Sequence, residues 1–252
     1  MQNLEIVEGL PLRKNLPIEN TADMPFETGE LRTRLEAFLK HQWVASSDQK
    51  PIKIGNYRWG IYAFYDYDGE PIYVGQTNEK LSTRIRRHLT NQRTDAVAMS
   101  VLDPYEVCYI EVWPIPELQN TPAKNAPQEA KDKLIALEYE AYQYLLTNSR
   151  FNAVLNEKAP IAPESREQLP PSLKVKIVSE EVSRLRDHPD LRIARRAATL
   201  ARLAKVIAER RVQKGLRVTL LTQARRLVDL AERRAGGAPL NIDADTDDED
   251  IN

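Results

Sequence analysis

The chain has 252 residues, of which 42% are apolar and 29% are charged, and its formal net charge is −1. This length accommodates one good domain plus an appendage. No run resembles a membrane span or a secretory signal, so we expect a cytoplasmic protein without a membrane partner. The single cysteine, Cys108, excludes an intramolecular disulfide and a cysteine-rich zinc site.

The small net charge hides a strong separation of charge along the chain. Residues 1–160 carry 18 Lys and Arg against 22 Asp and Glu, and residues 161–172 add −1. Residues 173–237 carry 17 basic against 7 acidic residues, which is +10, and residues 238–252 carry six acids and no base. The basic block indicates a polyanionic partner, although solvated helix faces would give the same count.

Apolar periodicity predicts a first helix over residues 30–41, which Thr28 could cap and in which Leu31, Leu35 and Leu39 share a face. Two runs rich in β-branched and aromatic residues follow, at 58–66 and 71–76. They flank Asp68-Gly69, a pair that readily adopts the positive φ angles of a tight turn. These runs therefore predict a β-hairpin.

The following segments predict an α+β fold. We expect, in chain order, a helix over 83–92, a short helix over 94–103, a third strand over 105–113 and a long helix over 129–148. The strands would form a small antiparallel three-stranded sheet flanked by helices. A proline-rich linker and an α-helical C-terminal region, with helices over 190–211 and 218–236, come next. The last fifteen residues are expected to be disordered.

Two short motifs lie on the strands of the predicted hairpin. Gly60-Ile61-Tyr62 and Tyr73-Val74-Gly75 place two tyrosines eleven positions apart. Arg84 lies eleven residues after Tyr73, His88 lies four residues later on the same helix face, and Glu140 stands twelve residues before Asn152. These four elements, in this order, resemble the GIY-YIG nuclease family over roughly residues 57–157.

The resemblance implies a metal-dependent endonuclease that hydrolyses phosphodiester bonds in DNA with Mg²⁺ or Mn²⁺. We expect a stand-alone enzyme, with restriction or defence as its role, because the chain lacks the length for a second nuclease domain. The implied catalytic residues are Tyr62, Tyr73, Arg84, His88, Glu140 and Asn152, and Glu140 is the implied metal ligand.

Each of these residue types suits the chemistry. One carboxylate, with waters completing the shell, is enough to hold Mg²⁺, and the Arg84 guanidinium matches phosphate oxygens. Tyr62 and Tyr73 are both candidates for the general base. We favour Tyr62, with Tyr73 orienting and His88 assisting proton movement, and the metal and Arg84 would have to lower the pKa of the phenol. Asn152 is expected to fix a catalytic neighbour.

Several alternatives remain open. Glu138 could be the metal ligand in place of Glu140, but residues two positions apart on a helix point in different directions. Gln76 stands where several relatives carry lysine, for which Arg86 or Arg87 could substitute. Taken singly, every candidate could be an ordinary core or surface residue, and only the ensemble favours a nuclease. A catalytically idle DNA-binding module, or an interaction protein using its acidic tail, would share the scaffold.

The basic block is expected to contact DNA phosphates. The candidate residues there are Arg192, Arg195, Arg196, Arg202, Lys205, Arg210 and Arg211. The same helices could instead form a homodimer through the stripe of Ile193, Leu200, Leu203 and Ile207. The predicted segments are an N-terminal extension with one helix (1–56), the catalytic domain (57–158), the linker (159–172), the basic helical region (173–237) and the acidic tail (238–252).

Overall fold

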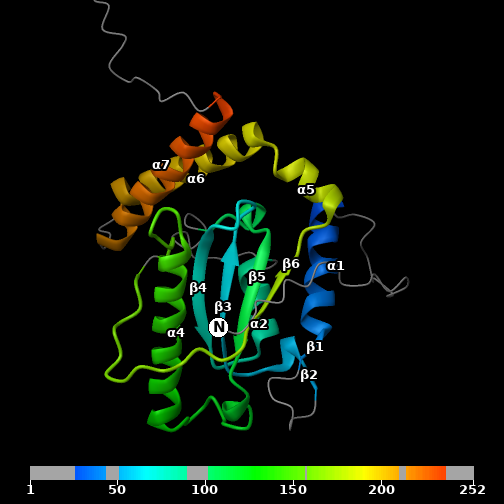
Figure 1. Cartoon of the computed structure of the whole chain (residues 1–252), viewed down its shortest axis with the longest axis vertical. Helices are drawn as coiled ribbons and strands as arrows, with labels where there is room; N and C mark the ends of the chain where they lie inside the picture. Colours follow the sequence, from blue (N-terminus) through cyan, green and yellow to red (C-terminus); the bar gives the residue numbers. More distant parts are fainter. Residues whose placement is uncertain (1–25, 44–50, 90–101, 157, 210–213, 237–252) are drawn as a thin grey trace, which may run out of the picture.

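The structure, a computed structural model, describes residues 26–43, 51–89, 102–156, 158–209 and 214–236. A four-stranded sheet lies between helices, and two further helices cross over one end of it (Figure 1). The α+β fold and the helical C-terminal region are therefore confirmed. No helix within these ranges is long and apolar enough to cross a membrane.

The sheet is antiparallel throughout and has the strand order β4-β3-β5-β6. Its strands are β3 (Gly60–Tyr65), β4 (Pro71–Thr77), β5 (Tyr109–Pro114) and β6 (Leu173–Lys176). The first three correspond to the expected strands. The fourth comes from the segment expected to be helical, because Leu173 and Val175 alternate with lysines and are buried where β6 pairs with β5.

The predicted hairpin joins β3 to β4. Asp66 Oδ1 accepts hydrogen bonds from the backbone N–H groups of Asp68 and Glu70, each at 2.9 Å, and Gly69 has a φ of 75°. The register places Tyr62 opposite Gly75 and Phe64 opposite Tyr73. Because side chains alternate between the faces of a strand, both tyrosines lie on one face of the sheet.

Helices cover both faces. On one face, α4 (Gln128–Asn148) packs Leu134 and Ala141 against Ile61 and Ala63. On the face that carries the tyrosines, α1 (Phe26–Lys40) and α2 (Leu81–Leu89) bury residues such as Leu35 and Ile85. The shorter elements are β1 (Gln42–Trp43), β2 (Ile52–Lys53) and the 3-10 helices η1 (Ile54–Asn56), η2 (Pro104–Glu106) and η3 (Pro116–Leu118).

The free edge of β4 is covered by the chain that follows α4. The Asn156 side chain accepts a hydrogen bond from the Val74 N–H at 3.0 Å and donates one to the Val74 carbonyl at 2.8 Å. The Leu155 N–H donates to the Ile72 carbonyl at 2.9 Å. These bonds hold the strand that carries Tyr73.

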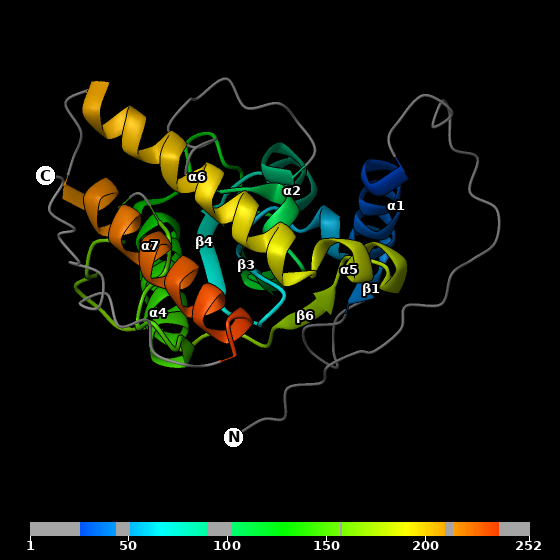
Figure 2. The same cartoon turned by 90° about the horizontal axis from the view of Figure 1, so that it is seen from above.

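The C-terminal region forms α5 (Glu180–Arg186), α6 (Pro189–Glu209) and α7 (Lys214–Arg234). Figures 1 and 2 show α6 and α7 side by side over the end of the sheet where β3 leads into β4. Leu203 of α6 and Leu216 of α7 belong to the same hydrophobic core as Phe64. The segments on either side of the predicted boundaries at residues 158 and 172 thus share one core. The division of the chain into five segments stays a prediction from composition.

Three expectations lie outside the described residues. They are the acidic tail at 238–252, most of the short helix at 94–103, and the two candidate DNA contacts Arg210 and Arg211.

Candidate active site

The hydroxyl of Tyr62 is the centre of a buried polar cluster between β3 and α2. It shares a hydrogen bond of 2.8 Å with His88 Nε2 and accepts one of 3.2 Å from Arg84 Nε. Arg84 and His88 are brought together because they lie four residues apart on α2, whose Leu81, Ile85 and Leu89 are buried. Tyr62 is fully buried and His88 is 2% exposed.

Tyr73 completes this cluster from the neighbouring strand. Its ring centroid lies 5.0 Å from that of His88 and 6.1 Å from that of Tyr62. Tyr73 is half-buried, so it is the phenol on the solvent side of the cluster. The structure therefore brings together four of the expected residues: Tyr62, Tyr73, Arg84 and His88.

Gly75 provides the space that Tyr62 occupies. A Cβ atom built on Gly75 would lie 2.6 Å from the Tyr62 hydroxyl oxygen and 2.9 Å from Cε1 of Tyr73. Such separations are far shorter than van der Waals contact. The glycine of the second motif is therefore required by the packing of the two tyrosines across the hairpin, a reason that the motif alone does not give.

The pKa of Tyr62 is raised well above its usual value, chiefly because burial disfavours the charged phenolate, and the neighbouring Tyr73 adds to the rise. Arg84 acts in the opposite direction but does not overcome burial. Arg84 acts in the expected direction, but without a bound ion its charge alone does not lower the pKa of Tyr62 below the usual value. In this state Tyr62 is a neutral hydroxyl that can pass a proton along its bond to His88.

Two carboxylates on α4 have different surroundings. Glu140 forms an ion pair with Arg166, whose Nη2 donates to Glu140 Oε2 at 3.0 Å. Glu138 interacts with the charge of Arg84 and with the backbone of Gln76, and burial raises its pKa to about 7. Within the described part of the chain, no cation lies at ion-pair distance from Glu138. The carboxylate beside the cluster is therefore Glu138.

The spacing to Asn152 favours Glu140 as the metal ligand, whereas the position on the helix favours Glu138. Glu138 follows Leu134 by four residues and precedes Ala141 by three, and both of these apolar residues face the sheet. Asn152 itself is exposed and adopts a φ of 47° in the turn after α4. The role expected of it, fixing a neighbour of the site, stays a prediction, and the asparagine that binds β4 is Asn156.

The described residues contain no group of three or more His, Cys, Asp or Glu that could hold a metal ion. A divalent ion with one protein ligand does not need such a group, since Mg²⁺ keeps several waters. Glu138 fits this requirement because it is a largely buried carboxylate without an ion-pair partner, and a cation would compensate its charge.

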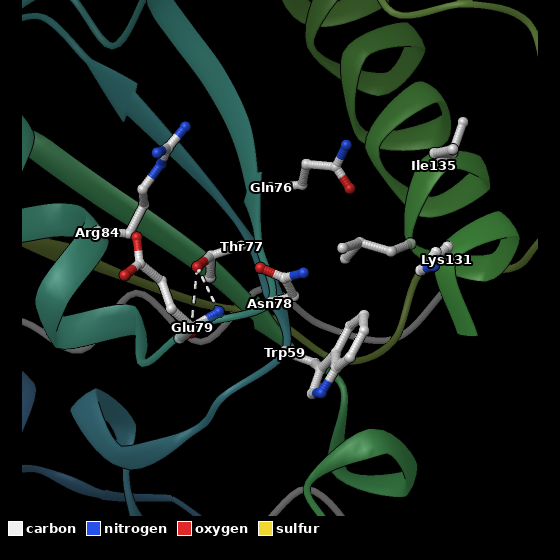
Figure 3. A pocket seen from close by; sticks show the side chains of 9 residues that line it. Trp59, Gln76, Thr77, Asn78, Glu79, Arg84, Lys131 and Ile135 are labelled. Atoms are coloured by element: carbon white, nitrogen blue, oxygen red, sulfur yellow. Dashed lines mark hydrogen bonds between the residues drawn. The ribbon is translucent and has the colours of Figure 1, made fainter. Parts of the chain in front are cut away.

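A pocket of about 300 Å³ adjoins the cluster, between the end of β4 and α4 (Figure 3). It is lined by Trp59, Gln76, Thr77, Asn78, Glu79, Arg84, Lys131, Leu134 and Ile135. Figure 3 shows Gln76 directed toward α4 and Arg84 on the other side of the strand. The site therefore extends around the edge strand of the sheet.

The expected substitutes for a lysine at Gln76 are engaged elsewhere. Arg86 pairs with Glu36 of α1 at 2.6 Å, and Arg87 pairs with Glu79 at 2.9 Å.

Several of the arginines expected to contact DNA phosphates instead form ion pairs with carboxylates of the same chain. Arg192 and Arg196 are 3% and 5% exposed and pair with Asp68 at 2.7 Å and with Asp66 at 2.8 Å, respectively. Arg195 pairs with Glu106 at 2.6 Å. Arg202 and Lys205 are exposed on α6. The phosphate-binding role stays a prediction, and among the described candidates it is best suited to Arg202 and Lys205, because Arg192, Arg195 and Arg196 already pair with carboxylates.

Part of the apolar stripe expected to form a dimer is likewise used within the protein. Leu203 is fully buried in the core, and Ile207 packs against it.

Comparison with known proteins supports the assignment of the hairpin and its surroundings. No curated protein and no solved structure matches the chain. Residues 58–119 match the family model described as GIY-YIG catalytic domain, a nuclease-type domain. This range contains Tyr62, Tyr73, Arg84 and His88. The chain thus carries a GIY-YIG catalytic domain over residues 58–119.

Proposed function

We propose that this protein is a metal-dependent endonuclease that hydrolyses phosphodiester bonds in DNA. The observation that supports this most is the hydrogen-bonded cluster of Tyr62, His88 and Arg84 within the matched domain. The proposal adds Glu138 as the ligand of a divalent ion, because its carboxylate lies beside Arg84 without an ion-pair partner among the described residues.

Arg84 would bind the scissile phosphate. Its Nε donates to Tyr62, and its remaining N–H groups have no hydrogen-bond partner among the described residues, so they could bind phosphate oxygens. A guanidinium so placed stabilises the negative charge that develops on the phosphate oxygens as the bond from the attacking oxygen to phosphorus forms. The ion held by Glu138 would add positive charge at the same phosphate and lower the pKa of a water.

Tyr62 and His88 would accept the proton of the attacking water. Because burial disfavours a free phenolate, we propose a relay in which Tyr62 takes the proton from water while its own proton moves to His88 Nε2. The departing sugar oxygen then takes a proton from solvent. Tyr73 would orient the water from the exposed side of the cluster. This relay needs no charged tyrosine at any stage.

The choice of carboxylate has a matched test, since Glu138 and Glu140 lie on the same helix. Glu138→Gln should lose cleavage of supercoiled plasmid in Mg²⁺ by on the order of 1000-fold, because several kcal/mol of charge stabilisation disappears. Glu140→Gln loses an ion pair to exposed Arg166 and should retain most of its activity. The reverse result would return the metal to Glu140. Wild-type protein that binds DNA and never nicks it would be a catalytically idle binding module.

The tyrosine roles can be separated by removing one hydroxyl at a time. Tyr62→Phe should lose on the order of 100- to 10,000-fold in single-turnover rate, a loss that higher pH does not restore. Tyr73→Phe should lose less. Because Tyr73 is the more exposed phenol, a larger loss in Tyr73→Phe would assign it as the group next to the water.

The expected restriction or defence role belongs to this proposal as well. Mg²⁺-dependent cleavage of a randomised duplex library would show whether one recognition sequence is cut.

A further inference from the structure

Two cationic side chains line the pocket beside the cluster without a carboxylate at ion-pair distance among the described residues. Arg84 and Lys131 both line it, and neither has an ion-pair partner among the described residues. Glu79 also lines the pocket, but its carboxylate is bound to Arg87 at 2.9 Å. The pocket is therefore suited to an anion, in contrast to the C-terminal helices, where Arg192, Arg195 and Arg196 already pair with carboxylates.

Lys131 is the cation on the far wall of this pocket. It is exposed on the first turns of α4, whereas Arg84 comes from α2 on the other face of the sheet. Lys133, two residues along the same helix, is held by Glu117 at 2.8 Å. A lysine ammonium kept free at a pocket wall binds phosphate as a point charge.

A second unsatisfied group lies in the pocket wall. The Oε1 atom of Gln76 is buried and has no hydrogen-bond partner among the described residues. A buried acceptor without a donor costs free energy, so a ligand that supplies a donor is favoured at this point. Phosphate oxygens cannot do so, whereas a sugar hydroxyl or a base N–H can.

We propose that this pocket binds the nucleotide adjacent to the scissile phosphate. Lys131 binds its phosphate, and Gln76 Oε1 accepts a hydrogen bond from a donor on its sugar or base. A volume of about 300 Å³ is at the lower end of the range for small-molecule sites and suits one nucleotide unit. The adjacency to the scissile phosphate rests on the proposed function, but the binding of a phosphate by Lys131 does not.

The test is binding of a fluorescein-labelled DNA duplex to the full chain in EDTA, measured across a salt series. The slope of log affinity against log salt is negative. Lys131→Met should make it less steep by about 0.9, because one phosphate contact is lost. Lys133→Met, a matched change on the same helix at an ion-paired lysine, should leave the slope unchanged. Both lysines lie on the surface, and equal melting temperatures would show that the variants fold.

An unchanged slope in Lys131→Met, or an equal change in Lys133→Met, would overturn the phosphate site. Gln76→Leu should weaken binding by about 2- to 12-fold without altering the slope, since a neutral hydrogen bond is lost. Unchanged affinity in this variant would remove Gln76 from the site. Because no cleavage occurs in EDTA, these results are independent of the nicking assay: an inactive protein with the Lys131 effect would keep the phosphate site and lose the catalytic proposal.

Discussion

The two ends of the β3–β4 hairpin differ in whether their charged side chains have ion-pair partners. At the turn, Asp66 is 1% exposed and is held by Arg196 at 2.8 Å and by Arg226 at 2.5 Å. At the other end, Arg84 and Lys131 line a pocket, and neither has a carboxylate at ion-pair distance among the described residues. A count of basic residues along the sequence therefore does not locate a phosphate site, because many of those charges bind carboxylates of the same chain.

The largest effect should come from removing the whole region that supplies the arginines at the turn. Deleting residues 173–252 removes β6 and the buried Leu173, Val175, Leu203 and Leu216. Burial of each such side chain contributes about 1.5–3 kcal/mol, and the sum approaches the entire stability of a domain, about 5–15 kcal/mol. We expect the truncated chain to show no cooperative thermal transition by circular dichroism. A truncated chain that melts within a few degrees of the full chain would show that residues 57–158 fold alone.

The next effect is the loss of one charge at the turn. Asp66→Asn leaves Arg196 and Arg226 buried opposite a neutral amide, and breaking a buried pair in this way costs about 3–5 kcal/mol. Urea unfolding measures the change. Lys205→Met is the control, because this lysine is 73% exposed and its ion-pair partner among the described residues is exposed Glu209. It should change stability by less than about 0.5 kcal/mol. Similar values for the two variants would contradict the importance of the paired end.

At the end of the hairpin that carries the proposed catalytic cluster, Gly75→Ala should change both packing and cleavage. The added methyl group meets the Tyr62 hydroxyl and the Tyr73 ring at less than 3.0 Å, and overpacking of this kind costs about 1–3 kcal/mol. The tyrosines must shift, so the bond from Tyr62 to His88 lengthens and cleavage falls. Ala63→Gly, a change of the same size on the other face of the strand, should affect stability without a comparable loss of cleavage per folded molecule. Full cleavage by folded Gly75→Ala would contradict the tight packing of the cluster.

The smallest effect is a dependence of stability on acid. Burial alone would raise the pKa of Asp68, but hydrogen bonds from Arg192 and Arg233 hold it below its usual value. The folded state thus binds this proton less readily than the unfolded state, so the stabilisation is complete above about pH 4 and is lost as the pH falls further. We expect no more than about 1 kcal/mol, because the side chain is partly exposed. Urea midpoints of the wild type should fall more steeply than those of Asp68→Asn between pH 4 and pH 2.

Local patterns in the sequence were sufficient for much of the fold. The hairpin, α1, α2 and α4 follow from alternation, turn residues and helical periodicity, and the motif spacing identifies Tyr62, Tyr73, Arg84 and His88. The strand β6 was missed although Leu173, Val175 and Ile177 alternate with polar residues, because four residues next to a basic helical block give a weak signal.

The rest depends on contacts between residues distant in the sequence. The pairing of Arg196 with Asp66 spans 130 residues, and nothing local distinguishes that arginine from exposed Arg202. The choice between Glu138 and Glu140 depends on the rotation of α4 against the sheet. Asn156 is indistinguishable from Asn152 until its side chain is seen on Val74.

The bonds from Asn156 to β4 also bear on self-association. An edge strand exposes N–H and C=O groups that can recruit a strand from another molecule and so begin aggregation. The primary amide of Asn156 offers one acceptor and one donor to Val74, as a neighbouring peptide group would, and Leu155 occupies the carbonyl of Ile72. An amide side chain thus serves as a fifth strand reduced to a single residue. It closes the β4 edge at Ile72 and Val74 to intermolecular pairing while leaving Gln76 and the pocket uncovered.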